Sequence, residues 1–215
     1  MFLLYVTLMI CIIYLLSKKH DDNYIIQKGV LDPELCNNII KISDKYSFED
    51  YTEEVDDKPA YEIDIYDSEA PGNHILNEEL WSISKNIYEV HLKRKYPKPP
   101  EYVFLRRYTG GERVDLPIHF DENEMTTSFL LSKQNEVEGG ELYIFNREMT
   151  NKYRYINYKP PHIKNEFIRN FKGLPVIEYD QGDMLSYKGK RHLHGVLPVT
   201  KGVRYTISFF FGCDG

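Results

Sequence analysis

Cysteine is scarce in this sequence, and the few cysteines are scattered. The 215 residues include three cysteines, at positions 11, 36 and 213, and no CxxC pair. Three isolated cysteines do not form a disulfide framework, and without CxxC spacing nothing indicates a structural zinc site. Cys36 and Cys213 could pair, but two ordinary buried thiols are the simpler interpretation.

Blocks of positive charge are also absent. The chain has 27 basic and 33 acidic residues, a net charge of -6, and no run of Lys or Arg longer than a few residues. General nucleic-acid binding depends on a basic surface, so the composition disfavours that function. The length fits one domain with a tail and excludes a second enzyme domain.

One long apolar run is present, over residues 2–16, and Lys18 and Lys19 follow it. The run is slightly shorter than the roughly 20 residues that cross a bilayer, and it lacks the basic start of a secretory signal. We expect an uncleaved membrane anchor over residues 1–19, with a cleaved signal or a buried N-terminal element as alternatives. The two lysines would hold the following domain in the cytosol by the positive-inside rule.

Residues 20–100 predict a region of helices that supports a following β domain. Asp32 and Pro33 provide a cap and a first-turn proline for one helix, and a second helix is expected over residues 77–95. Helical spacing predicts the buried faces of the two helices as Leu35, Ile39, Ile42 and Tyr46, and as Leu80, Ile83, Ile87 and Val90. Two strands are also expected in this region, over residues 23–31 and 61–66.

Residues 101–215 show a different pattern, in which short apolar strands alternate with turns. The turns contain Gly, Pro and Asn, and this arrangement predicts a double-stranded β-helix, the jelly-roll relative of cupins. The fold class is therefore mainly β with flanking helices. An irregular insert over residues 146–181 is expected to be a lid, a substrate loop or a plain surface excursion. The strands are expected over residues 102–108, 116–120, 126–131, 141–145, 184–187, 192–199 and 204–211.

His119 and Asp121 are the first candidate metal ligands. Side chains i and i+2 of a strand share a face, so these two can present one nitrogen and one oxygen to a common point. His194 can supply a third ligand if two remote strands come side by side. Two histidines and one carboxylate on one face of a metal form the ligand set of non-haem Fe(II) oxygenases.

Arg204 lies ten residues after His194, at the start of a strand. Its guanidinium could bind the carboxylate of a 2-oxo acid in a bidentate way, and Thr206 on the same face could donate a hydroxyl to it. His192 is an alternative to His194, because it lies on the same face two residues earlier. The ten-residue interval favours His194 and leaves His192 at the rim, where it meets substrate or solvent.

These residues and their flanking motifs resemble the 2-oxoglutarate/Fe(II) dioxygenases, and within them the prolyl and lysyl hydroxylase group. The resemblance covers roughly residues 101–212. An HxD motif alone would be weak, but the four motifs in this order are together specific. They are His119-Phe120-Asp121, Glu138-Gly139-Gly140-Glu141-Leu142, Gly182-Asp183-Met184-Leu185 and His194-Gly195-Val196-Leu197-Pro198-Val199-Thr200-Lys201-Gly202-Val203-Arg204-Tyr205.

The resemblance implies a set of cofactors and a location. It implies Fe(II), 2-oxoglutarate and O₂, with ascorbate as a reductant, and oxidative decarboxylation of 2-oxoglutarate to succinate. Related hydroxylases place a tyrosine against the co-substrate near the position of Tyr108. The group also suggests the endoplasmic reticulum lumen, against the cytosolic orientation that Lys18 and Lys19 indicate.

The expected function is hydroxylation of a prolyl or lysyl side chain in a protein or peptide. A hydroxylase of a free amino acid or small molecule is the main alternative, and a catalytically silent, membrane-tethered interaction module is another. A nucleic-acid demethylase of the same chemistry would carry a second arginine six residues after the first. Phe210 occupies that position, so this activity is disfavoured.

Overall fold

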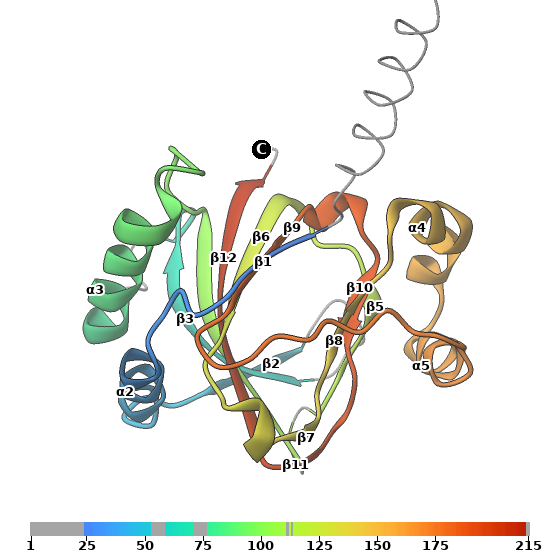
Figure 1. The fold of residues 1–215 in the computed structure, drawn as a ribbon, viewed down its shortest axis with the longest axis horizontal. Coiled ribbons are helices and arrows are strands. Elements are labelled where there is room, and N and C mark those ends of the chain that lie inside the picture. Colours follow the sequence, from blue (N-terminus) through green and yellow to red (C-terminus); the bar gives the residue numbers. More distant parts are fainter. Residues whose placement is uncertain (1–23, 53–58, 71–76, 111, 113, 214–215) are drawn as a thin grey trace, which may run out of the picture.

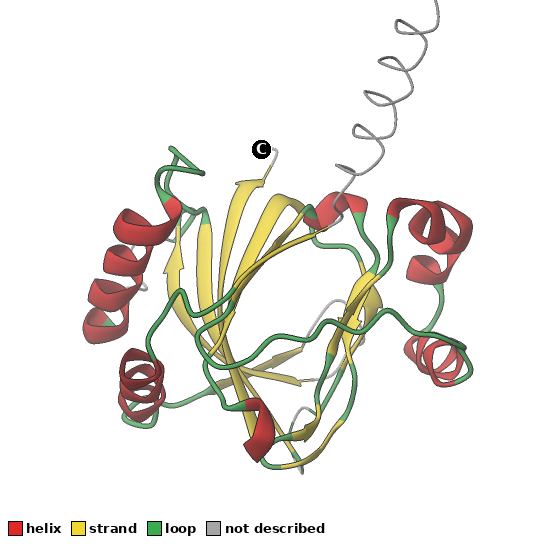
Figure 2. Cartoon of the chain, viewed as in Figure 1, coloured by secondary structure: helices red, strands yellow, loops and turns green. Residues whose placement is uncertain are grey.

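Two facing β-sheets organise the chain, with helices on the outside of each (Figures 1 and 2). The structure is a computed structural model that describes residues 24–52, 59–70, 77–110, 112 and 114–213. In these ranges no helix is long and apolar enough to cross a bilayer. The anchor predicted over residues 1–19 lies outside the described residues.

The large sheet has seven antiparallel strands, and the small sheet that faces it has three. A two-stranded ribbon closes one end. The large sheet runs in the order β1 (Tyr24–Gln27), β9 (Met184–Tyr187), β6 (Asn123–Leu130), β12 (Val203–Cys213), β4 (Tyr102–Thr109), β3 (Pro59–Asp67) and β2 (Glu49–Thr52). The small sheet is β5 (Leu116–His119), β10 (His194–Val196) and β8 (Leu142–Ile144), and the ribbon pairs β11 (Val199–Lys201) with β7 (Glu138–Gly139). This mainly β architecture with flanking helices is consistent with the predicted jelly-roll core.

One predicted strand, over residues 192–199, is wrong as a single element. The structure divides it into β10 and β11, which belong to different sheets. The chain changes sheets at Leu197 and Pro198, where the Leu197 amide donates to Glu141 and the Pro198 carbonyl accepts from Gly140. Proline lacks an amide hydrogen, so a strand cannot run through this position with its ladder intact.

Helix α2 (Pro33–Ser43) covers the outer face of the large sheet, as its sequence predicts. Asp32 caps it by accepting a hydrogen bond from the Leu35 amide at 2.8 Å. Ile39 and Ile42 are buried in the main core cluster, where they join β12 side chains of the sheet's outer face, such as Phe209. Cys36 is a buried free thiol of the same helix.

The second predicted helix is divided by a change of helical pitch. It consists of α3 (Glu78–Ile87) and a π-helical turn, η2 (Tyr88–Leu92). A π turn holds one more residue than an α turn, so it rotates the following side chains. Val90, predicted to be buried, is therefore 63% exposed, while Tyr88 and Leu92 face the core.

The insert over residues 146–181 is not irregular throughout, because helical elements occupy its first two thirds. Its role as a lid or a substrate loop stays a prediction. It contains α4 (Arg147–Tyr153), the 3-10 turn η4 (Arg154–Tyr158) and α5 (Pro161–Arg169). These elements have a hydrophobic cluster of their own, which includes Phe145, Ile156 and Ile168 and joins Ile118 of β5. The insert is thus packed against the outer face of the small sheet.

Three strands of the region over residues 20–100, β1, β2 and β3, join the large sheet. β1 and β3 overlap the strands predicted over residues 23–31 and 61–66, whereas β2 was not predicted. Asp183 holds the end of β1 in place, since its carboxylate accepts from Lys28 Nζ and the Gly29 amide, both at 2.8 Å. Gly182 has φ +82°, and a Cβ there would lie 2.0 Å from the Leu31 carbonyl oxygen. The Gly182-Asp183 motif therefore has a structural role at this joint.

Candidate metal centre and co-substrate pocket

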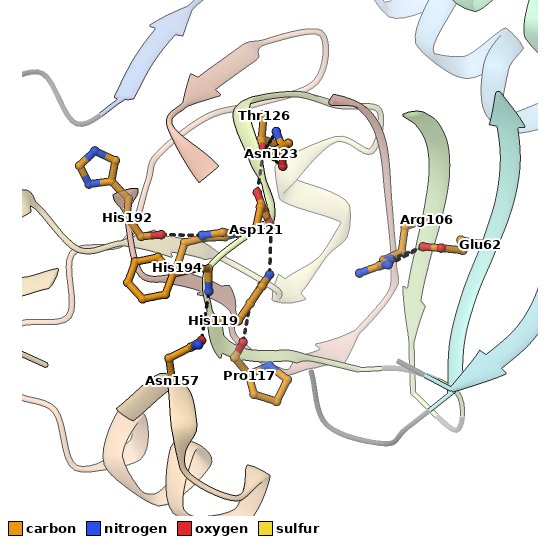
Figure 3. A network of polar contacts seen from close by, with 11 residues as sticks. Glu62, Arg106, Pro117, His119, Asp121, Asn123, Thr126, Asn157, His192 and His194 are labelled. Atoms are coloured by element: carbon orange, nitrogen blue, oxygen red, sulfur yellow. Dashed lines mark hydrogen bonds and ion pairs between the residues drawn. The ribbon is translucent and has the colours of Figure 1, made fainter. Parts of the chain in front are cut away.

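His119 and His194 are direct neighbours across the small sheet. In the antiparallel pairing of β5 with β10 the two residues are partners in register, although 75 positions separate them along the chain. Asp121 follows β5 and completes the group, as Figure 3 shows. One potential ligand atom from each of the three residues lies within 4.8 Å of the others.

Hydrogen bonds to the backbone orient both imidazoles. His119 Nδ1 lies 2.8 Å from the Pro117 carbonyl oxygen, and His194 Nδ1 lies 2.9 Å from that of His192. A protonated Nδ1 that donates to a carbonyl leaves Nε2 with a free lone pair. Each Nε2 lies close to Asp121 Oδ1, at 3.3 Å for His119 and 3.2 Å for His194. Three electron-pair donors therefore face one point.

The other oxygen of Asp121 is held by the large sheet. Thr126, on β6, donates its hydroxyl to Asp121 Oδ2. Gly189 passes so close that a Cβ there would lie 2.6 Å from the Asp121 Cβ. A larger residue at position 189 would displace the carboxylate, so the backbone itself fixes the position of this ligand.

The electrostatics of the site favour an ionised carboxylate and a neutral first histidine. Burial raises the pKa of the Asp121 carboxyl, but the charge of His194 and the contacts with both histidines hold that pKa well below 3.8. Burial and the neighbouring His194 lower the pKa of His119. Burial also lowers the pKa of His194, but the Asp121 charge outweighs it and raises that pKa above 6.5.

This donor set fits a first-row divalent metal. Two imidazole nitrogens and one carboxylate oxygen from one side are the facial arrangement that Fe(II) oxygenases use. The Nδ1 contacts and Thr126 supply the outer hydrogen bonds that such ligands need. In the described part of the chain, no other group of three or more His, Cys, Asp or Glu side chains has this spacing.

The triad opens onto a cavity of about 670 Å³ between the two sheets. Its floor consists of inward side chains of β4 and β12, which form rungs across the two strands. Successive rungs lie about 7 Å apart, because they are two residues apart along a strand. The rungs, in order from one end of the cavity, are Arg204 with Tyr108, Thr206 with Arg106, Ser208 with Phe104, and Phe210 with Tyr102.

Arg204 forms the cationic end of this cavity. It is 4% exposed, its Nη2 donates to the Tyr179 hydroxyl at 2.6 Å, and its guanidinium lies 5.3 Å from the centre of the Tyr108 ring. A Cβ at Gly140 would lie 3.0 Å from the Arg204 Cδ. The second glycine of the Gly139-Gly140 motif thus makes room for the arginine. Tyr108 and Thr206 both line the cavity beside it.

A buried ion pair lies on the next rung. Arg106 Nε and Nη2 contact Glu62 Oε2 at 2.7 and 2.5 Å, and the two side chains are 8% and 4% exposed. The guanidinium also stacks over Phe104, at 4.6 Å from the ring centre. Figure 3 shows the pair across the cavity from the triad. Beyond it lies an aromatic wall, defined as Tyr102, Phe104 and Phe210.

The structure does not bring His192 to this cavity. His192 precedes β10, it is buried, and its Nδ1 lies 3.1 Å from the Phe145 carbonyl oxygen on the side of the insert. Its side chain is turned away from the triad in Figure 3. The strand begins two residues later than predicted, so the expected shared face with His194 does not exist.

Several residues of the site were not predicted from the sequence. Glu62 meets Arg106 through the pairing of β3 with β4, and Tyr179 meets Arg204 from a loop before β9, so neither contact has a local signal in the sequence. Thr126 lies only five residues after Asp121, but it was not predicted either. Asn157, in the insert, is a further example. Its Oδ1 accepts from the Phe120 amide, between the two HxD ligands, at 3.2 Å, and it lines the cavity. For Arg106 a weak signal existed, since it lies two residues before Tyr108 on the same strand face.

Solved structures with this fold include three whose similarity extends over most of both chains. They are HygX of Streptomyces hygroscopicus with nickel and 2-oxoglutarate bound (TM-score 0.57, 11% identity, 89% of this chain and 83% of that one), a prolyl-4-hydroxylase of Pseudomonas putida (0.54, 13%, 88% and 92%), and a prolyl hydroxylase of Trichoplax adhaerens in complex with a peptide fragment of the hypoxia inducible factor oxygen degradation domain (0.54, 11%, 90% and 81%). At these identities the likeness shows a shared fold. No curated protein matches the chain in sequence.

The family assignment comes from the sequence of the β core. The profile of the 2OG-Fe(II) oxygenase superfamily matches residues 103–212, which span β4 to β12 and include all three triad residues and Arg204. The match covers just over half of the chain and confirms the resemblance of the four motifs. The chain belongs to the 2OG-Fe(II) oxygenase superfamily.

Proposed function

We propose that this oxygenase hydroxylates a side chain of a protein or peptide, coupled to decarboxylation of 2-oxoglutarate. The observation that carries the proposal is the meeting of His119, Asp121, His194 and Arg204 in one cavity. With Fe(II) bound, such a centre supplies the reaction in which a C–H bond, O₂ and 2-oxoglutarate give the alcohol, succinate and CO₂.

The chain has three tasks in this reaction. The triad holds the metal, and the backbone contacts of both Nδ1 atoms keep the ligand nitrogens aimed at it. Arg204 holds the distal carboxylate of 2-oxoglutarate, with Thr206 and Tyr108 beside it. The apolar side chains of Leu116, Leu142 and Val196 line the same cavity and limit access of water.

The charge balance of the cavity favours a neutral substrate group. Fe(II) and the 2-oxoglutarate dianion cancel each other, so a proline ring would leave the site neutral, whereas a lysine ammonium would add a buried charge. The aromatic wall also suits a ring, since proline-rich peptides bind in grooves lined by aromatic side chains. The charged side chains that line the cavity are three cations, Arg106, Lys164 and Arg204, and three anions, Glu62, Asp121 and Glu122.

A free amino acid is the second candidate substrate, and the buried ion pair favours it. Arg106 and Glu62 present a cation and an anion side by side on the cavity wall. The carboxylate of a free amino acid could pair with Arg106 and its ammonium with Glu62, so that two contacts with the ligand replace the internal ion pair. The two candidates differ in which compounds stimulate turnover.

The test is a screen for succinate release. The protein is purified without oxygen, supplied with Fe(II) and 2-oxoglutarate, and offered proline-rich peptides, lysine-containing peptides and free amino acids. Proline-rich peptides are expected to stimulate succinate release and to gain one oxygen atom by mass. Stimulation only by free amino acids would favour the second candidate.

Variants of the triad test the metal assignment. His119→Ala, Asp121→Ala and His194→Ala are each expected to abolish Fe(II)-dependent succinate production, because each removes one of three ligands. His192→Ala is the matched control, as it removes a neighbouring histidine that lies outside the cavity. If all three triad variants stayed active, the site would be misassigned.

We also propose that the apolar run of residues 2–16 anchors the protein in a membrane. The uncharged composition of the run supports this proposal. The full chain is expected to remain in the membrane fraction after extraction at alkaline pH. Release into the soluble fraction would contradict the proposal.

A further inference from the structure

The helical insert has a charge opposite to that of the rest of the chain. Residues 147–172, here named the basic lobe, contain seven Lys or Arg and two acidic residues, a net charge of +5. The remainder has 20 basic and 31 acidic residues, a net charge of -11. The modest total of -6 therefore hides a strongly divided molecule, and such asymmetry indicates an interaction surface.

The charges of the basic lobe are on its surface. Six of its seven cations are exposed, and only Lys164 is buried. Lys188 and Arg191 add two exposed cations nearby, because the segment that follows them is bonded to the middle of α4: the Leu193 amide donates to the Thr150 hydroxyl. The exposed cations of the lobe are Arg147, Lys152, Arg154, Lys159, Arg169 and Lys172.

The basic lobe is continuous with the catalytic cavity. Arg154 lies over the ring of Phe120, 5.0 Å from its centre, and Phe120 stands between two of the metal ligands and lines the cavity. Asn157 and Lys164 of the lobe line the cavity as well. A polymer that enters the cavity from this side must therefore pass over the lobe.

Two large aromatic side chains are exposed on the same turn of the lobe. Tyr155 is 54% exposed and Tyr158 is 73% exposed, and they flank the buried Ile156 and the cavity-lining Asn157 on η4. Exposed tyrosines contribute contact area with a polar tip, which is typical of surfaces that bind other molecules. The surface thus combines positive charge and aromatic contact at the cavity.

We propose that the basic lobe docks an acidic segment of the polypeptide substrate, next to the residue that enters the cavity. This inference rests on the proposed function, since it takes the substrate to be a peptide. Acidic side chains would pair with Arg154 and its neighbours, and complementary charge would speed encounter and set the direction of the chain. A long nucleic acid fits less well, because its charge continues past the lobe onto the acidic remainder of the molecule.

The experiment measures binding without turnover, so it does not depend on whether hydroxylation occurs. Two peptides with the same central proline, one flanked by glutamates and one by serines, carry the same dye and are titrated with the full chain by fluorescence anisotropy. The glutamate peptide is expected to bind about tenfold more tightly, with an advantage that falls as salt is added. Equal binding of the two peptides would overturn the proposal.

Charge reversal locates the interaction. Arg154→Glu together with Lys159→Glu is expected to remove the preference for the glutamate peptide, and the milder Arg154→Gln with Lys159→Gln to reduce it. Arg94→Glu with Lys98→Glu is the matched control. It makes the same change in net charge at exposed residues of the segment that follows α3 and η2. Helix α3 lies on the far side of the barrel from α4 and α5 (Figure 1). The control should keep the preference, and an equal loss in both double variants would overturn the proposal.

A third probe separates the two classes of polyanion. A single-stranded DNA oligonucleotide with the same number of negative charges as the glutamate peptide is titrated at the same ionic strength. The peptide is expected to bind more tightly. If the oligonucleotide bound more tightly and the lobe variants removed that binding, the basic lobe would be a nucleic-acid surface and the proposal would be wrong.

Discussion

Two buried arginines line the same cavity, and they are held in different ways. Arg204 of β12 and Arg106 of β4 are 4% and 7% exposed, and they lie on neighbouring rungs of one sheet. Arg106 pairs with the Glu62 carboxylate at 2.5 Å. Arg204 instead meets the neutral Tyr179 hydroxyl and the Tyr108 ring.

The difference lies in the counter-ion, which only one of the two arginines has. In the part of the chain that the structure describes, no carboxylate pairs with Arg204. A buried cation without a counter-ion is costly, and a bound dianion would remove that cost. Arg106 already has its counter-ion, so the Arg106–Glu62 pair makes the cavity wall polar but adds no net charge to it. Position in the cavity alone would not separate these roles.

The largest effect is expected from breaking the internal pair. Arg106→Met leaves Glu62 buried without its cation, which should lower the free energy of unfolding by about 3 to 5 kcal/mol. Urea unfolding followed by circular dichroism measures this change. Glu62→Gln combined with Arg106→Met removes both charges and should recover much of the loss. A cost below about 1 kcal/mol for the single variant would contradict the view that the pair is buried and balanced.

Replacing Arg204 should affect ligand binding more than the stability of the fold. Arg204→Ala is expected to weaken 2-oxoglutarate binding by about 10- to 100-fold, the worth of about 1.5 to 3 kcal/mol of charge-assisted hydrogen bonds. It should destabilise the fold less than Arg106→Met, because it leaves no uncompensated carboxylate. Arg204→Lys keeps the charge without the planar guanidinium, so its affinity for 2-oxoglutarate should lie between those of the wild type and Arg204→Ala. An unchanged apparent affinity for 2-oxoglutarate in Arg204→Ala would argue against a role of Arg204 in binding it.

Asp183 extends the comparison to a buried anion with an exposed partner. Burial raises its pKa, but hydrogen bonds from Lys28 and the amides of Asp180 and Gly29 bring the pKa below 3.8. Its stabilising effect is therefore complete above about pH 4 and is lost as the pH falls through the lowered value. Asp183→Asn should cost about 1 to 2 kcal/mol at neutral pH and less in acid, as chemical unfolding at several pH values measures. A cost that does not change with pH would contradict this assignment.

The smallest expected effect concerns the hydroxyl next to Arg204. Tyr179→Phe keeps the ring in its cluster and removes only the 2.6 Å hydrogen bond. A neutral hydrogen bond contributes about 1 kcal/mol, so 2-oxoglutarate binding should weaken a few-fold. Tyr143→Phe is a control, because it removes a buried tyrosine hydroxyl of another cluster. An equal effect of both variants on 2-oxoglutarate binding would show that the Tyr179 hydroxyl does not orient Arg204.

Local spacing and the family resemblance together chose most of the candidate site. The i, i+2 rule chose His119 with Asp121, and the β pattern allowed His194 to reach them, which the strand register then realises. Thr206 follows from Arg204 by the same rule, and Tyr108 came from the resemblance alone. Arg204, Thr206 and Tyr108 all line the cavity.

Other features depend on contacts that local spacing does not encode. Glu62 meets Arg106 only because β3 pairs with β4, and Tyr179 reaches Arg204 from a loop before β9. Val90 was misplaced because a π turn changes the phase of the helix. The insert was taken for an irregular loop because its helices are short and close a small core of their own.

Whether the triad and Arg204 form one site for 2-oxoglutarate is decided by measuring its binding to the metal-loaded protein. Calorimetry without oxygen would compare wild type, His194→Ala, Arg204→Ala and the Glu62→Gln, Arg106→Met double variant, each with and without Fe(II). We predict metal-dependent binding at one site in wild type, little in His194→Ala, weakened binding in Arg204→Ala and near-normal binding in the double variant. Binding that needs neither the metal nor Arg204, or no binding to the wild type, would contradict the account.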